Sequence, residues 1–374
     1  MDNEARVTGG LDPACRKGRR SIIRRGRRSP YREARRDSVS GRGDRRGATY
    51  AALDLGTNNC RLLVARPTRD GFHVIDAFSR IIRLGEGLST SGRISEAAIE
   101  RAVGALSVCR DKMNNRGVTR ARLIATEACR VAVNGLEFLE RVREQVGLTL
   151  EIVDRETEAE LAATGCTPLI APDAEGVILF DIGGGSSELV RLAQSEVDLF
   201  GPPQPVIRGW TSLPVGVVTL AERHGGVSVS RELFELMIAE VGEFIACFAS
   251  AHGGDLNRTH MLGTSGTVTT IAGVYLNLPR YDRRQVDGCW MSDDEVTNVI
   301  ERLLAMSYRD RAANPCIGSE RADLVLAGCA ILEAIRRAFP CARLRVADRG
   351  LREGILVQLM REDAVWGGVP EGVR

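Results

Sequence analysis

The clearest pattern in the sequence is a short apolar run that ends in an Asp-x-Gly turn and then resumes. Residues 50–56 form one such run, and apolar positions return at 62–64. Residues 177–183 form a second, and apolar positions return at 189–190. A run, a tight turn and a returning run predict a β-hairpin. Because the two copies align, we interpret the chain as duplicated, with one hairpin opening each half.

The rest of the chain alternates predicted strands with predicted helices. Apolar positions at helical spacing predict helices after Ser95, near 138–146, from about Glu156 to Gly165, near 293–306, near 320–337 and from Leu351. Short apolar runs predict strands near 122–125, 148–153, 261–262 and 344–346. This alternation favours an α/β fold. We expect domain I at 48–156 and domain II at 157–348, with a closing helix at about 349–362 that packs back on domain I.

Length and composition support two globular domains. The chain has 374 residues, more than one hydrophobic core normally serves. No window approaches 18 consecutive apolar residues, which argues against a membrane partner. The ten cysteines include no C-x-x-C pair. We therefore expect reduced cysteines, no zinc site and a cytoplasmic location.

The charge is strongly uneven. Residues 1–47 hold 15 Lys or Arg against 6 Asp or Glu, about +9, whereas the remainder is about −7. With little apolar periodicity, we expect this basic tail to be disordered. Three interpretations of the basic tail stay open: a loose polyanion-binding arm, a functionless extension, or a start codon assigned too far upstream. Nucleic acid is expected as a partner only through this tail, if at all.

The glycine-rich turns are the candidate chemistry. Only Lys17 and Lys112 are lysines, and neither supplies the G-K-[ST] of a Walker A loop. The four histidines form no metal-ligand spacing. Asp54 and Asp181 each end a predicted strand before a turn that can cradle phosphate oxygens while the carboxylate holds hydrated Mg²⁺. A third Gly/Thr loop lies at 263–267. An ordinary β-hairpin is the alternative for either turn alone.

Duplicated turns of this kind resemble the actin-like ATPase superfamily, in which two related domains close on a phosphate chain. Further motifs resemble the Ppx/GppA family of exopolyphosphatases and guanosine pentaphosphate phosphatases. The motifs are Arg83-Leu-Gly-Glu-Gly-Leu88, Ala125-Thr-Glu-Ala-Cys-Arg130, Glu156-Thr-Glu-Ala159, Asp181 to Glu188, Glu320-Arg-Ala-Asp323 and Asp348 to Gly354. The resemblance implies an α/β fold of two duplicated actin-like (ribonuclease H-like) domains with an interdomain cleft, in the short two-domain form.

The resemblance also implies roles for individual residues. Glu158 would activate the water; the alternative interpretation is an acid in the first turn of a helix, favoured there by the helix dipole. Asp54, Asp181 and Glu188 would hold Mg²⁺ or a similar divalent cation; a solvated strand-end acid is the alternative for Glu188. The implied phosphate-binding residues are Gly56, Thr57, Asn58, Asn59, Arg130, Gly183, Gly184, Gly185, Ser186, Gly263, Ser265, Gly266 and Arg321.

The sequence departs from the family pattern in three places. Asn59 stands where Ser is common, which leaves the detailed metal shell open. Thr157 replaces the first Glu of a paired Glu-Glu-Ala, and Ser187 replaces Thr.

The expected function is hydrolysis of the terminal phosphoanhydride of inorganic polyphosphate. Guanosine pentaphosphate 5′-phosphohydrolase is the alternative, and the body's negative charge modestly favours short chains or a nucleotide. An actin-like nucleotide-binding module without fast turnover, or a kinase, is the alternative from another class. A homodimer is also considered.

Overall fold

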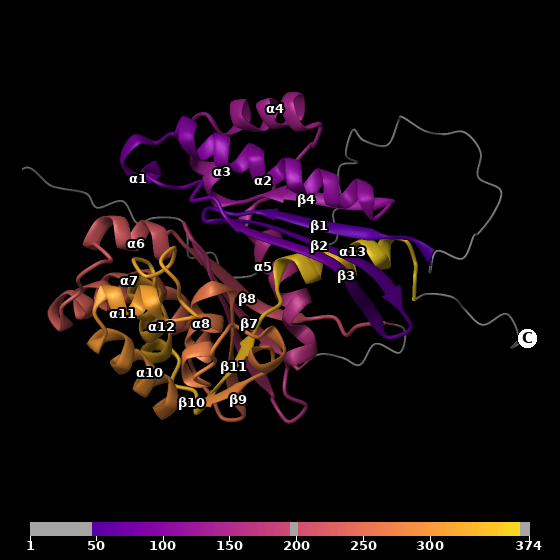
Figure 1. Cartoon of the computed structure of the whole chain (residues 1–374). Coiled ribbons are helices and arrows are strands. Elements are labelled where there is room, and N and C mark those ends of the chain that lie inside the picture. The colour runs from indigo at the N-terminus through magenta and orange to yellow at the C-terminus, as the bar shows by residue number, and fades with distance from the viewer. Residues whose placement is uncertain (1–46, 195–200, 367–374) are drawn as a thin grey trace, which may run out of the picture. The chain divides into compact units, whose positions relative to one another are not determined.

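The computed structural model describes residues 47–194 and 201–366, which lie in one compact unit that starts at residue 44. The predicted basic tail, residues 1–47, falls outside the described residues except for Gly47. The described chain forms two lobes, each built on one mixed β-sheet (Figure 1).

The first lobe contains a five-stranded sheet. Its strands are β1 (Tyr50–Leu55), β2 (Asn59–Thr68), β3 (Gly71–Ile81), β4 (Arg120–Ala125) and β5 (Glu151–Ile152), in the order β3-β2-β1-β4-β5. β1, β2 and β3 are antiparallel, whereas β4 and β5 run parallel to β1. The helices are α1 (Leu88–Ser91), α2 (Glu96–Asn115), α3 (Glu127–Val131) and α4 (Gly135–Val146). Helices α2 and α4 cover one face of the sheet (Figure 1).

The second lobe repeats this sheet order and adds an edge strand. Its strands are β6 (Gly176–Ile182), β7 (Ser187–Ala193), β8 (Val206–Leu213), β9 (Thr259–Thr264), β10 (Trp290–Ser292) and β11 (Arg343–Ala347), in the order β10-β11-β9-β6-β7-β8. Its helices are α6 (Val217–His224), α7 (Arg231–His252), α8 (Ser265–Tyr275), α9 (Arg283–Val286), α10 (Asp293–Ala305), α11 (Tyr308–Ala313) and α12 (Val325–Ala338). The predicted fold of two duplicated α/β domains is confirmed, because β6-β7-β8-β9-β11 repeats β1-β2-β3-β4-β5 in order and direction.

Two helices cross between the lobes. Helix α5 (Arg155–Cys166) follows β5 of the first lobe but packs on the sheet of the second. Helix α13 (Leu351–Glu362) follows β11 of the second lobe but packs on β1 and β2 of the first. The expected domain boundaries remain a prediction.

Helices α5 and α13 approach each other closely where they cross (Figure 1). A Cβ on Gly165 would lie 1.9 Å from the carbonyl oxygen of Gly350, and a Cβ on Gly354 would lie 1.9 Å from that of Leu161. Both distances are shorter than carbon and oxygen tolerate, so the crossing depends on glycine at both positions.

The described cysteines and helices can be compared with two expectations from the sequence, namely reduced thiols and the lack of a membrane-spanning segment. Eight cysteines in the described ranges are free thiols, and seven of them are buried. No helix within residues 47–194 and 201–366 is long and apolar enough to cross a membrane.

Candidate active site

The turn of the first hairpin is held by backbone hydrogen bonds. The N–H of Gly56 donates to the carbonyl of Asn59 at 2.9 Å and closes the turn. The carbonyl of Thr57 accepts from the N–H of Gly85, also at 2.9 Å. These contacts fix the backbone and leave the side chains at 57–59 available for another partner.

Three side-chain oxygens of this turn are buried without a hydrogen-bond partner among the residues that the structure describes. They are Thr57 Oγ1, Asn58 Oδ1 and Asn59 Oδ1. Leaving a buried polar atom unsatisfied costs about 1–3 kcal/mol. Three such atoms in consecutive residues indicate a ligand site.

The turn of the second hairpin lies directly against the first. The N–H of Gly183 donates to the carbonyl of Ser186 at 3.0 Å. A Cβ on Gly184 would come within 2.9 Å of the Thr57 Cβ, and a Cβ on Gly185 within 3.0 Å of the Thr57 hydroxyl. The two turns therefore meet at van der Waals distance, and the glycines make that approach possible.

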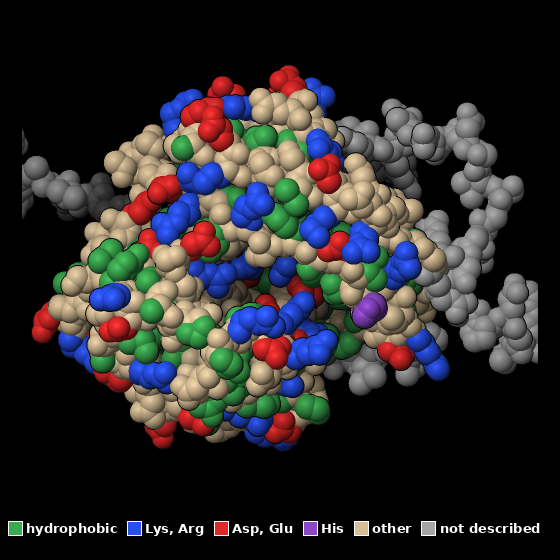
Figure 2. Space-filling model, in the orientation of Figure 1, with side chains coloured by type: hydrophobic (Ala, Val, Ile, Leu, Met, Phe, Trp, Pro, Cys, Tyr) green, Lys and Arg blue, Asp and Glu red, His purple; other side chains and the backbone are tan. Residues whose placement is uncertain are grey.

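Both turns line one cavity of about 540 Å³ between the lobes, here called the central cavity. Figure 2 shows a hollow between the lobes with Lys and Arg side chains around its opening. Helices α8 and α13 begin at this cavity, because Ser265, Gly266 and Leu351 line it. Helix N-termini carry free N–H groups and partial positive charge, which favour an anionic ligand.

Most of the predicted site residues line the central cavity. They are Asp54, Gly56, Thr57, Asn58, Asn59, Glu158, Asp181, Gly183, Gly184, Gly185, Ser186, Glu188, Ser265, Gly266 and Arg321. Two predicted phosphate-binding residues do not line it. Gly263 lies within β9, where a Cβ would meet the Phe180 ring at 2.5 Å. Arg130 instead binds two glutamates next to the cavity.

Arg130 belongs to a network of alternating charges. Its guanidinium donates to Glu127 at 2.7 Å and to Glu158 at 3.0 Å. Arg155 donates to the other oxygen of Glu127 at 2.7 Å. Burial alone would raise the pKa of Glu127, but the hydrogen bonds from Arg155 and Arg130 lower it overall. Arg130 thus fixes the orientation of the Glu158 carboxylate.

The cavity carboxyl groups have raised pKa values because they are buried close together. Burial and the nearby Glu188 raise the pKa of Glu158 well above its ordinary value, against the opposing effect of Arg130. Burial and Asp181 raise the pKa of Glu188 to about 7. Burial raises the pKa of Asp181 to about 6 and also raises that of Asp54. Four carboxyl groups with raised pKa values indicate a site in which bound cations would stabilise the ionised carboxylates.

The hydrogen-bond partners of Glu188 fix its position. Its Oε1 accepts from the hydroxyls of Ser186 at 2.8 Å and Ser212 at 2.9 Å. The side chain is only 3% exposed. Glu188 is therefore held on β7 opposite Asp181 rather than solvated at a strand end.

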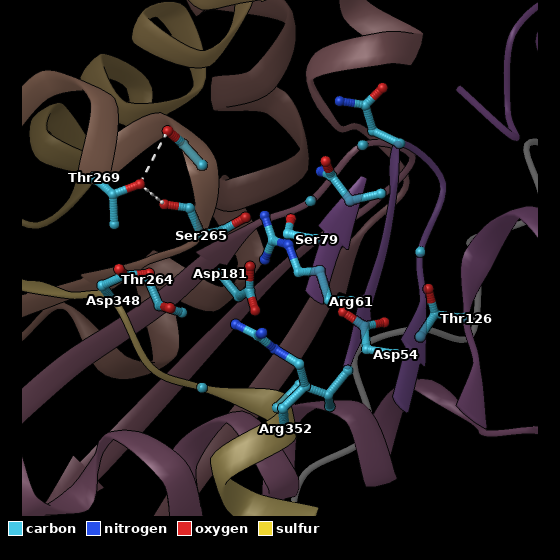
Figure 3. A pocket seen from close by; sticks show the side chains of 18 of the residues that line it. Asp54, Arg61, Ser79, Thr126, Asp181, Thr264, Ser265, Thr269, Asp348 and Arg352 are labelled. Carbon is cyan, nitrogen blue, oxygen red and sulfur yellow. Dashed lines mark hydrogen bonds between the residues drawn. The ribbon is translucent and has the colours of Figure 1, made fainter. Parts of the chain in front are cut away.

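Four arginines that line the cavity were not among the predicted site residues: Arg61, Arg283, Arg349 and Arg352. Arg61 lies on β2 and Arg352 in the first turn of α13, and both point toward the space between Asp54 and Asp181 (Figure 3). Burial lowers the pKa of Arg352. Arg61 could have been found from the sequence, because a hairpin with this turn pairs it with Asp54. Arg352 could not, because only the return of α13 to the first lobe brings it there.

Arg61, Arg321 and Arg352 form no ion pair within 4 Å in the part of the chain that the structure describes. The other cavity arginines have carboxylate partners: Arg283 pairs with Glu353, and Arg349 with Asp287. Burying an unpaired charge is costly unless a counter-ion binds. Three unpaired arginines around one cavity therefore favour a multiply charged anion.

The carboxyl groups of the central cavity are candidate ligands for a metal ion. Within residues 47–194 and 201–366, no three Asp, Glu, His or Cys side chains converge closely enough to enclose a metal ion. Mg²⁺ is usually bound by one or two carboxylates together with waters and substrate phosphates. Asp54 and Asp181, which enter the same cavity from opposite lobes, fit that arrangement rather than an all-protein cage.

Comparisons with known proteins show which family the chain belongs to. The model of the Ppx/GppA phosphatase family matches residues 63–363. The chain belongs to the Ppx/GppA phosphatase family. Members of this family are phosphatases that hydrolyse phosphoanhydride bonds and are generally dependent on divalent cations. The resemblance expected from the sequence is confirmed.

Two curated relatives of this Ppx/GppA chain differ in their substrate. Exopolyphosphatase 2 of Mycobacterium tuberculosis is 28% identical over 330 residues, which cover 83% of this chain and 98% of the relative. Guanosine-5'-triphosphate,3'-diphosphate pyrophosphatase of Aeromonas hydrophila is 27% identical over 312 residues, which cover 83% of this chain and 59% of the relative.

Solved Ppx/GppA structures share the fold. The Aquifex aeolicus family member has a TM-score of 0.68 and 28% identity, and the match covers 84% of this chain and 98% of that one. An exopolyphosphatase from Cytophaga hutchinsonii has a TM-score of 0.75 and 23% identity over 85% and 99% of the two chains, which shows the fold alone.

Proposed function

We propose that this protein is an exopolyphosphatase, which removes the terminal phosphate of inorganic polyphosphate with the aid of Mg²⁺ or a similar divalent cation. The observation that carries the proposal is the convergence of Arg61, Arg321 and Arg352 on a cavity walled by two glycine turns; none of the three has an ion pair within the described ranges. Their charges match a chain of linked phosphates. The Mycobacterium tuberculosis exopolyphosphatase, which this chain covers almost completely, supports the same substrate.

The terminal phosphoryl group would lie where the two turns meet. Thr57, Asn58 and Asn59 would turn their unpartnered side chains toward ligands there, and the free N–H groups at the start of α8 would bind phosphate oxygens. The unpaired arginines would bind the oxygens of the following phosphates through their guanidinium groups. Asp54 and Asp181, with Glu188 beside them, would hold the divalent cation, which would neutralise charge on the phosphates.

Glu158 would act as the general base. A water molecule attacks the terminal phosphorus in line with the bridging oxygen, and its proton passes to Glu158 as the phosphorus–oxygen bond to the chain breaks. The products are orthophosphate and a chain one unit shorter. Arg130 has a different role from the predicted phosphate contact: its hydrogen bond orients Glu158 and opposes the rise in the pKa of Glu158 that burial and Glu188 cause.

Guanosine pentaphosphate is the second candidate substrate. The Aeromonas hydrophila relative supports it, and Phe78 in the cavity wall provides an aromatic side chain that a base would contact. A cytoplasmic location and a homodimer remain predictions.

The test compares hydrolysis of medium-chain polyphosphate, guanosine pentaphosphate and ATP in Mg²⁺. We expect phosphate release from polyphosphate without any acceptor, and we expect Glu158→Gln to lower kcat by at least roughly 10²-fold while polyphosphate binding survives. Glu160→Gln, on the exposed side of the same helix, is the matched control and should retain activity. Wild-type turnover by Glu158→Gln would exclude Glu158 as the base. Binding of ATP without release of phosphate from any substrate would favour the nucleotide-binding module.

A further inference from the structure

Two sequence motifs contact each other across the cleft through residues that have no role in the proposed chemistry. Arg83, just after β3, donates to both carboxylate oxygens of Asp323, at 3.0 and 3.2 Å, and to the carbonyl of Glu320 at 3.0 Å. Asp323 lies just before α12 in the other lobe. A second contact is close by, where Glu222 of α6 accepts from the N–H of Gly87 at 2.8 Å. These contacts join the first lobe to the second beside the glycine turns.

On the first lobe, Arg83 is attached to the phosphate-binding turn. Its N–H donates to the carbonyl of Asn58 at 3.1 Å. Arg101 supports the same segment from α2 by donating to the Arg83 carbonyl at 3.2 Å and to Glu86 at 2.8 Å. The φ angle of Arg83 is 46°, a left-handed conformation that costs free energy in a residue other than glycine. Such strain persists where the surrounding contacts determine the backbone.

On the second lobe, Asp323 belongs to the segment that carries Arg321. The guanidinium of Arg321 lies beside Gly266, at 3.7 Å from the position of a Cβ on that glycine. Arg311, only 2% exposed, holds this segment by donating to the carbonyl of Ala322 at 3.2 Å. A movement of Asp323 would therefore move the backbone of Arg321.

We propose that Arg83 and Asp323 are positioning residues that hold the cleft closed and place Arg321 against the two glycine turns. The kinetic part of this proposal rests on the proposed function. The two side chains are 32% and 25% exposed, so water screens their interaction less than that of a surface pair. Opposite charges with two hydrogen bonds fix a distance and an orientation between the lobes, which a single contact would not do.

The predicted consequence concerns substrate binding more than chemistry. Neither Arg83 nor Asp323 lines the central cavity, so removing their interaction leaves the groups that would react in place. Loss of the Arg83–Asp323 interaction shifts the population toward molecules with a more open cleft. The apparent affinity for substrate then falls with the fraction of closed molecules. An effect on KM that exceeds the effect on kcat distinguishes this role from a catalytic one.

The experiment uses the full chain and tripolyphosphate as the probe. In a Glu158→Gln background, we expect Arg83→Ala to weaken tripolyphosphate binding about five- to tenfold, the range for losing a partly buried ion pair. Without ligand, we expect faster hydrogen exchange in peptides that cover 56–59 and 183–186. The exchanged pair Arg83→Asp with Asp323→Arg should restore much of both.

The matched control is Arg337→Ala. Arg337 makes an equivalent two-pronged contact with Glu235, at 2.7 and 2.9 Å, but both residues lie in the second lobe. Its loss removes an ion pair without freeing one lobe from the other, so tripolyphosphate binding and exchange in the two turns should stay unchanged.

The outcomes separate this proposal from the proposed function. Arg83→Ala with unchanged exchange in both turns and unchanged tripolyphosphate affinity would overturn the positioning role. The positioning role would also be overturned if Arg337→Ala weakened tripolyphosphate binding as much as Arg83→Ala does. Absence of polyphosphate hydrolysis by the wild type would refute the exopolyphosphatase assignment, whereas faster exchange in Arg83→Ala would still support a closing contact.

Discussion

The hairpins β1–β2 and β6–β7 occupy equivalent places in their sheets and differ at one decisive position. Each has an aspartate near the end of its first strand, Asp54 or Asp181. The residue opposite in register is Arg61 in the first hairpin and Glu188 in the second. The duplicated hairpins therefore share one backbone arrangement, and they differ in the sign of the charge opposite the aspartate. In the proposed function, the first hairpin would bring a phosphate-binding cation, and the second would bring a further carboxylate near the metal.

The largest expected effect comes from making the two hairpins alike. Arg61→Glu would add a carboxylate to a cavity where burial already raises the pKa of Asp54 and Asp181, and would remove the Arg61 charge that opposes this rise. We expect kcat/KM for polyphosphate to fall by roughly 10²–10³-fold, the range for losing a buried charged contact. Arg66→Glu, at an exposed position of the same strand, is the control. Activity within tenfold of wild type would contradict the division of roles.

A smaller effect is expected from the two turns themselves. An alanine Cβ at Gly184 would lie 2.9 Å from the Thr57 Cβ, whereas a Cβ at Gly56 would have no heavy atom closer than 3.5 Å. We expect Gly184→Ala to lower the free energy of unfolding by about 1–3 kcal/mol, as overpacking does, and Gly56→Ala to change it by less than about 1 kcal/mol. Urea denaturation measures both. Equal effects would show that the turns do not press on each other as described.

The smallest effect concerns β3, the edge strand beside the first hairpin. Asp76 on β3 accepts from Lys112 and Arg116, each at 2.8 Å, and these hydrogen bonds lower the pKa of Asp76 to about 2 from an ordinary 3.8. A lowered folded-state pKa stabilises the protein fully above about pH 4, and this contribution is lost as the pH falls toward 2. Asp76→Asn should therefore reduce stability by roughly 1 kcal/mol at neutral pH.

Thermal unfolding of Asp76→Asn and wild type as a function of pH checks this expectation. The difference between them should shrink between pH 4 and pH 2. A difference that is constant over this range would mean that the charge of Asp76 is not its cause.

The sequence predicted the hairpins and the alternation well because both are local. An apolar run with an Asp-x-Gly turn specifies its own hairpin, whatever the rest of the chain does. Helix α7 was also predictable, because Phe234, Met237 and Val241 follow helical spacing, but it was not predicted. Helix α12 begins at Val325 rather than near 320, since the preceding residues form turns that present Arg321 to the cavity.

The candidate site was less predictable where it depends on tertiary packing. Arg352 is one of 49 arginines, and its place in the cavity follows only from the crossing of α13. Arg130 binds Glu127 three residues earlier on α3 and also reaches Glu158, so its guanidinium is already occupied. The sequence motif identified Arg130 as important without showing which groups it contacts.

The exchange of helices α5 and α13 has a consequence for the chain as a whole. Each sheet completes its hydrophobic core with a helix that directly follows a strand of the other sheet. Neither half could then be produced alone as a stable protein, because cutting the chain between them would leave one sheet with an uncovered apolar face. The duplicated halves can diverge in their side chains, as Arg61 and Glu188 did, but they have to be inherited, synthesised and folded together.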